Sequence, residues 1–366
     1  MASRMFSHWL LVLIQGLSAF WALVLRLGKG PGGVCHDILT PAGICACEGQ
    51  LDPYYCYRDE LAFRAGVSSL IIYLLLVALT IQGSLSTLWN ARGCQRVAAL
   101  AAVALIQFVL LLIALCLPSG LFLAVDNVGM FGAAAYRVMQ AVLFMDWAYN
   151  LNDQLYDNAV QMRRRLVDGS AFTWRLGAMV VASGLLLLGS LIAAIFLCIN
   201  EPEVTWCVVA SVIGSLFLLI VSITNWCEHG SLMTSSVMLA YTVYLCHQVA
   251  EIRPDVGDHE DDDVPTTLYG LLVPACSLGY FAISSSPARH LAGRHTSIGD
   301  ADDAFDSNDF LLRCGVHCLA DFYVTSCLAP RVSWLRFNVR AVTVFVCIVV
   351  YGWSLVAPKI LSARSF

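Results

Sequence analysis

The chain has 366 residues, of which 59% are hydrophobic and only 13% are charged, and its mean hydropathy is +0.73. Soluble domains carry about 25% charged residues, so this composition excludes a water-soluble globule and indicates a protein that crosses a membrane several times. The formal net charge of -5 says little about partners, because many of the acidic residues lie in two loops. No basic stripe with interleaved aromatic residues is present, so nucleic-acid binding is excluded as well.

Ten apolar segments are long enough to cross a bilayer, because a spanning helix needs about 20 mostly apolar residues. The first segment contains Trp9 and Trp21 and no small-residue cleavage pattern, so we expect a retained helix rather than a signal peptide. The whole chain, 1–366, is predicted to be one integral membrane domain. The predicted spans lie at about 6–27, 61–83, 96–117, 127–152, 173–198, 204–225, 231–251, 267–286, 308–329 and 337–360.

Lysine and arginine gather on one side of these ten predicted spans, and cytosolic loops carry an excess of both residues. Both termini are therefore predicted to be cytosolic. The cytosolic set is Arg4, Arg92, Arg96, Arg163, Arg164, Arg165, Arg289, Arg294, Lys359 and Arg364. The opposite side receives Lys29, Arg58, Arg253 and Arg331.

The first non-cytosolic loop, 28–60, contains four cysteines within a short polar stretch, Cys35, Cys45, Cys47 and Cys56. In an oxidising compartment the first expectation is two disulfides, with three pairings open. The alternatives are a zinc site that includes His36, and free thiols.

Two further loops are polar. Residues 253–266 form an acidic, non-cytosolic loop that lacks the spaced ligands and glycine turn of a calcium loop, so a solvated loop is expected rather than a cation site. Residues 287–307 are predicted to be a flexible cytosolic loop. No N-glycosylation sequon, nucleotide-binding glycine loop, His-Glu-x-x-His motif or Gly-x-Ser-x-Gly motif is present, so we expect no enzyme activity and no cofactor or metal.

A polar stripe interrupts the fourth apolar segment. Asp146, Asn150, Asp153 and Asp157 are spaced by four, three and four residues, which places them on one helix face. Asn152 in the same segment is a further candidate for a polar groove. No glycine or proline occurs between Gly132 and Arg165, which predicts one helix of about 33 residues that exceeds the bilayer thickness. Three interpretations stay open for the stripe: polar contacts between helices, a groove for lipid headgroups, and a proton or ion pathway.

Charged residues also lie inside other apolar segments, where each needs a partner. Arg137 is nine residues before Asp146 and about half a turn out of phase, so the two need different partners. Arg64, Asp321 and Arg340 are further intramembrane charges. We expect Asp321 to pair with an arginine, without specifying which.

Four motifs in order resemble the serine incorporator family, also called Serinc, TMS or TDE proteins. They are NVGMFGA (127–133), MDWAYNLND (145–153), SSVMLAYTVYL (235–245) and YGWSLVAPKILSARSF (351–366), with a further similarity in CYRDELAFR (56–64). The family's histidine in the fourth helix is replaced here by Tyr149, and His317 is displaced from the family's position in the ninth helix. The chain therefore resembles a divergent member.

The resemblance implies an all-α polytopic membrane protein with about ten transmembrane helices in two subdomains around a long diagonal fourth helix, which the tenth helix crosses. It implies a function in phospholipid and sphingolipid handling, either serine incorporation into membrane lipids or phospholipid scrambling without ATP. The implied partners are membrane phospholipids, including phosphatidylserine, and lipid-synthesising enzymes. The implied location is the plasma membrane or an endomembrane, and the oligomeric state stays open. A small-solute transporter or channel and a structural or receptor-like membrane protein are the alternatives.

Overall fold

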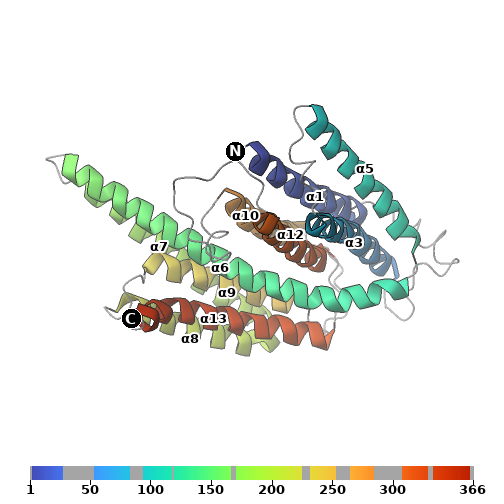
Figure 1. Ribbon diagram of the computed structural model, residues 1–366. Helices are drawn as coiled ribbons and strands as arrows, with labels where there is room; N and C mark the ends of the chain where they lie inside the picture. Colours follow the sequence, from blue (N-terminus) through green and yellow to red (C-terminus); the bar gives the residue numbers. More distant parts are fainter. Residues whose placement is uncertain are drawn as a thin grey trace. The chain divides into compact units, whose positions relative to one another are not determined.

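The computed structural model describes residues 2–27, 53–82, 94–117, 119–165, 170–224, 231–252, 264–283, 307–328 and 333–362. Within these residues the chain forms ten α-helices and one short 3-10 helix. The helices are α1 (Ala2–Leu27), α3 (Pro53–Ile81), α5 (Cys94–Cys116), α6 (Ser119–Arg165), α7 (Ser170–Asn200), α8 (Thr205–Ile223), α9 (Leu232–Ala250), α10 (Val264–Ile283), α12 (Ser307–Leu328) and α13 (Trp334–Ser362), with η2 (Pro202–Val204) before α8. Figure 1 shows them along the chain.

The described fold is all-α, as predicted, and each of the ten expected apolar segments overlaps one of these helices. Six helices are long and apolar enough to cross a membrane within the described residues: α3, α5, α6, α7, α8 and α13. Shorter apolar stretches occur in α1 and α10. The protein is thus a multi-pass membrane protein, and the number of ten spans stays a prediction.

Two boundaries differ markedly from the sequence-based expectation. Helix α3 begins at Pro53 rather than near 61, so the expected loop 28–60 ends earlier, and proline is favoured at the first position of a helix. Helix α6 has 47 residues and begins at Ser119 rather than near 127, which gives a length of about 70 Å. Three glycines, Gly120, Gly129 and Gly132, lie inside this helix without ending it.

The described chain divides into two compact units, and the division falls within α6 between Tyr136 and Arg137. Unit 1 comprises Met1–Tyr136 and Val256–Arg331, and unit 2 comprises Arg137–Asp255 and Val332–Phe366. Each unit has its own hydrophobic core, so each is described separately below.

In unit 1, α3 is the central helix and packs against α1, α5 and α12, while α10 packs against α12. Buried residues make up 72% of the apolar span of α3 but only 17% of that of α5, so α5 exposes most of its apolar surface. Close packing on α12 uses Gly132, because a Cβ added there would lie 2.6 Å from Cδ2 of Phe322. The main apolar cluster joins α1, α3 and α12 through Leu10, Leu11, Ile14, Ile72, Tyr73, Leu76, Phe310 and Cys314.

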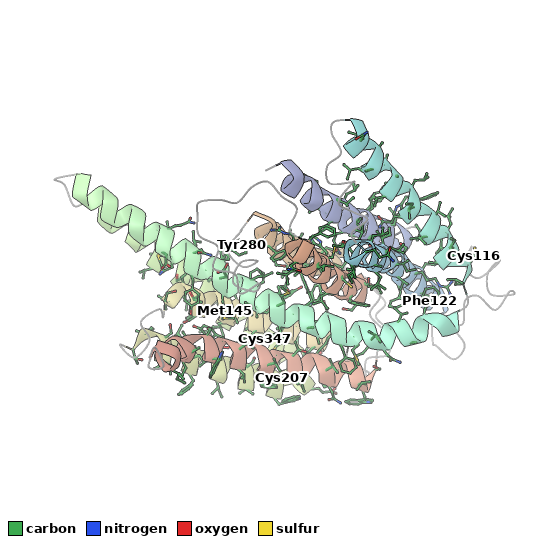
Figure 2. All side chains as sticks on the ribbon, in the orientation of Figure 1. Cys116, Phe122, Met145, Cys207, Tyr280 and Cys347 are labelled. Atoms are coloured by element: carbon green, nitrogen blue, oxygen red, sulfur yellow. The ribbon has the colours of Figure 1, made fainter. Side chains whose placement is uncertain are left out.

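In unit 2, α9 is the central helix and packs against α7, α8 and α13. Its buried face carries hydroxyl side chains as well as apolar ones, and Ser235 Oγ lies 2.7 Å from the hydroxyl of Tyr351 on α13. Ser231 caps α9, since its Oγ accepts the backbone N–H of Thr234 at 3.1 Å. Met145, Cys207 and Cys347 belong to the core of this unit (Figure 2).

Candidate functional site

The polar stripe predicted in the fourth helix lies on α6 within unit 2. Asp146, Asn150 and Asn152 are partly buried, and Asp153 is exposed. Asn152 Nδ2 makes a long contact of 3.5 Å with Asp153 Oδ1. Asp157 lies on the same helix, but its side chain is outside the described residues.

The stripe lies to one side of the packed core of unit 2. On α6 this core receives Ala141 and Met145, with Val138, Phe144 and Tyr149 packed against it. At 100° per residue, the mean direction of these five residues differs from that of the stripe by about 120°.

This face belongs to a segment that is long enough to cross a membrane, Ala124–Leu155, whose mean hydropathy of 1.4 is lower than that of the other five spans. An aspartate facing lipid at the centre of a bilayer costs about 2.5 to 3.5 kcal/mol on insertion scales. A face that carries Asp146, Asn150 and Asp153 is therefore suited to water or lipid headgroups and poorly suited to acyl chains.

Arg64, one of the predicted intramembrane charges, is fully buried in unit 1. Its Nε lies 3.2 Å from Oε1 of Glu60, one turn earlier on α3. Its Nη1 donates to the carbonyl oxygens of three residues at the end of α5, including that of Leu117 at 2.6 Å. The guanidinium carbon lies 4.7 Å from the ring centroid of Phe122. Arg64 thus neutralises a buried carboxylate and caps the carbonyl end of a neighbouring helix.

Two further predicted charges meet at Gln248 in unit 2. Arg137 Nε donates to Gln248 Oε1 at 3.2 Å, and Arg340 Nη1 donates to the backbone oxygen of the same residue at 2.7 Å. The amide nitrogen of Gln248 donates to the hydroxyl of Tyr244 at 2.9 Å. Sequence reasoning did not identify Gln248, because an uncharged amide in a helix gives no charge signal.

Asp321 is almost completely buried in unit 1, and its described partners are neutral. Its carboxylate accepts hydrogen bonds from Gln15 Nε2 at 3.2 Å and Ser18 Oγ at 3.0 Å, and it is also hydrogen-bonded to Ser69 Oγ. The expectation that Asp321 pairs with an arginine is therefore wrong for the described part of the chain. Three hydroxyl and amide groups surround the carboxylate instead.

The residues around Asp321 were missed in the sequence, although one signal was present. Gln15 and Ser18 are three residues apart, so they share one face of an otherwise apolar helix. The displaced histidine, His317, lies one turn before Asp321 and stacks on Tyr73 with ring centroids 6.2 Å apart. Tyr73 in turn donates its hydroxyl to Gln15 Oε1 at 3.1 Å.

The cysteine prediction falls mainly on residues outside the described part of the chain. Cys35, Cys45 and Cys47 lie there, and Cys56 lies in the first turn of α3 with its side chain outside the described set. Most of the acidic loop 253–266 and of the loop 287–307 is also outside, and α10 and α12 begin at Val264 and Ser307. Among the residues described, no group of three or more His, Cys, Asp or Glu side chains is placed to hold a metal ion.

The fold and these buried polar clusters define an all-α, multi-pass integral membrane protein with two compact units. The family model of the serine incorporators, described as Serine incorporator (Serinc), matches residues 41–309 of the chain. This match covers more than half of the 366 residues, so the chain belongs to the serine incorporator family. Comparison with curated proteins gives no match.

Proposed function

We propose that this protein moves phospholipids between membrane leaflets without ATP, and that their headgroups pass along the polar face of α6. The carrying observation is that Asp146, Asn150 and Asp153 share a polar face centred about 120° from the core-facing side of α6, on a helix long and apolar enough to cross a membrane. A polar face of this kind lowers the cost of taking a charged headgroup through the hydrocarbon region, because amide and carboxylate groups replace part of its hydration. The sequence contains no nucleotide-binding glycine loop, which agrees with transport that is not driven by ATP.

The test uses purified full-length protein in liposomes that carry a fluorescent phospholipid in both leaflets. Added dithionite bleaches only the outer leaflet in protein-free vesicles, so about half of the fluorescence persists. We expect bleaching to proceed well beyond half in vesicles that contain the protein. If bleaching stops at half in vesicles shown to contain folded protein, the proposal is rejected.

The role of the stripe is tested with the double substitution Asp146→Asn and Asp153→Asn, which keeps side-chain size and removes two charges. We expect the rate of lipid transfer to fall several-fold, because the path loses the charged groups that hold water and headgroup amines. Glu203→Gln is the matched control, since it makes the same chemical change at an exposed residue beyond α7. Equal rates in the double variant and the control would show that the stripe is not the path.

A second candidate function follows from the family description, which names serine incorporation. In that function the protein brings serine to lipid-synthesising enzymes, and phosphatidylserine and sphingolipids are the products. Cells that express the protein would incorporate more labelled serine into lipids, while purified protein would leave dithionite bleaching at half. Uptake of labelled serine into the same vesicles would instead indicate the solute-transporter alternative.

The proposed orientation places both termini in the cytosol, at the plasma membrane or an endomembrane, with the arginine-rich end of α6 on the cytosolic side. Epitope tags at the two ends test this. Both tags should bind antibody only after permeabilisation of the plasma membrane, and a tag accessible in intact cells would contradict the orientation.

A further inference from the structure

The buried polar cluster around Asp321 joins three helices of unit 1 by side chains that carry no positive charge. Asp321 comes from α12, Gln15 and Ser18 come from α1, and Ser69 comes from α3. The exposed fraction of Asp321 is 1%. An ionised carboxylate in such a place costs several kcal/mol unless a cation accompanies it.

The number of hydrogens in the cluster is smaller than the number of contacts to be bridged. Ser69 Oγ lies 2.7 Å from the backbone oxygen of Gly66 and 3.0 Å from Ser18 Oγ, and it also contacts an oxygen of Asp321. Ser18 Oγ lies 3.0 Å from the other carboxylate oxygen. These four contacts between oxygen atoms share only two hydroxyl hydrogens, one from each serine. One more proton or a small cation would bring the positive centres closer to the number of these contacts.

A second observation also indicates a surplus of acceptors. Gln107 on α5 is 1% exposed, and its Nε2 donates to the backbone oxygen of Ile14 at 3.1 Å, next to Gln15 in the chain. Its Oε1 is buried and has no hydrogen-bond partner among the described residues. A buried acceptor without a donor is costly and uncommon, and this one lies on α5, which packs against α1 in the same unit.

We propose that Asp321, Ser18, Ser69 and Gln15 bind one small monovalent cation from solution, either a proton on the carboxylate or Na⁺. A proton supplies a third hydrogen for the four contacts between oxygen atoms. Na⁺ achieves the same neutralisation through the carboxylate and the two hydroxyl oxygens, because hard cations prefer oxygen ligands, while Gln15 donates its amide nitrogen to the carboxylate. The site lies in unit 1 and is independent of the lipid path proposed on α6.

Few ionisable groups lie near the site, so a change in stability with pH can be assigned to Asp321 by substitution. Among the described side chains, α1 contributes only the neutral Gln15 and Ser18. Helix α10 packs on α12. Arg313 on α12 lies two turns before Asp321, and its guanidinium carbon is 5.7 Å from the ring centroid of Phe281 on α10. The nearby ionisable groups are Tyr73 on α3 and Cys314, His317 and Cys318 on α12.

The experiment measures the melting temperature of the purified full-length protein while pH and Na⁺ are varied at constant ionic strength, with choline as the replacement ion. A cation that binds only the folded state raises the melting temperature as its concentration rises. We expect a rise on acidification if the ligand is a proton, and a rise with Na⁺, together with saturable binding of labelled Na⁺, if the ligand is sodium. Asp321→Asn should abolish the response, and Glu203→Gln should keep it.

A second variant and a direct measurement guard against loss of folding in Asp321→Asn. Ser69→Ala removes one oxygen ligand and keeps the carboxylate, so it should shift the response to higher cation concentration. In infrared difference spectra, the carbonyl stretch of a protonated carboxylic acid should disappear on alkalinisation if the ligand is a proton. A wild-type melting temperature that does not change with pH or Na⁺ would overturn the proposal, and so would an identical response in Ser69→Ala or in folded Asp321→Asn.

Discussion

The most direct test of the unit 1 core replaces the buried Arg64 by methionine, which keeps a long apolar stem and removes the guanidinium. The substitution eliminates the ion pair with Glu60 and three hydrogen bonds to carbonyl oxygens at the end of α5. It also removes the contact between the guanidinium and the ring of Phe122.

The expected loss follows from what is left behind. Breaking a buried ion pair by removing one member costs about 3 to 5 kcal/mol, because the remaining charge is not neutralised. Glu60 is only 7% exposed, so water cannot readily solvate it. The carbonyl groups of α5 lose a charged donor as well, but these contributions are not additive. We therefore expect the free energy of unfolding to fall by about 3 to 5 kcal/mol in Arg64→Met.

The measurement is equilibrium unfolding by SDS in mixed micelles, followed by circular dichroism. The double variant Arg64→Met with Glu60→Gln should lose less than the sum of the two single variants, because no carboxylate is left unneutralised. Leu75→Ala is a control on the same helix, where the side chain is 49% exposed and the change should be within about 0.5 kcal/mol. A loss below about 1 kcal/mol in Arg64→Met would refute the reasoning, since it would show that these contacts contribute little.

Substitutions at four further positions test helix packing, helix capping and a buried hydrogen bond by the same unfolding assay. Gly132→Ala should destabilise by about 1 to 3 kcal/mol, because its Cβ meets the ring of Phe322, whereas Gly189→Ala on α7 meets nothing within 4 Å and should stabilise by about 0.5 to 1 kcal/mol. The same sign for both would contradict the proposed contact. Ser231→Ala should cost about 1 kcal/mol through loss of the α9 cap, and an unchanged stability would show that the cap is dispensable. Gln248→Leu should cost about 1.5 to 3 kcal/mol because it removes an acceptor of a buried guanidinium, while Gln248→Glu should retain stability, and equal losses in both would refute this role.

The composition and the apolar runs were sufficient to predict an all-α membrane protein, because a spanning helix satisfies its own backbone hydrogen bonds and needs only length and hydropathy. Helix α6 shows the limit of that reasoning. The sequence predicted a continuous helix after Gly132, but α6 starts at Ser119 and continues through three glycines in unit 1. Tertiary packing decides here, since Gly132 lies against Phe322 at a distance that excludes a larger side chain.

For the site residues, too, the sequence predicted some properties and the structure supplied the others. The period of 3.6 residues per turn placed Asp146, Asn150 and Asp153 on one face, but only the structure showed that the core of unit 2 packs on a different side of α6. The sequence also identified Asp321 as a charge that needs a partner. It could not supply the partners, because Gln15, Ser18 and Ser69 are neutral residues on α1 and α3, 252 to 306 positions away along the chain.

By itself, then, the sequence determined that the chain is an all-α membrane protein, which residues share a helix face and which family the motifs resemble. These properties depend on hydropathy and on local helical geometry, and both act over a few turns of one segment. Only the tertiary structure decided that Arg64 caps α5, that Arg137 and Arg340 meet at Gln248, and that Asp321 is held by hydroxyl and amide groups. Such contacts join residues far apart in the chain, and they are set by how the helices pack.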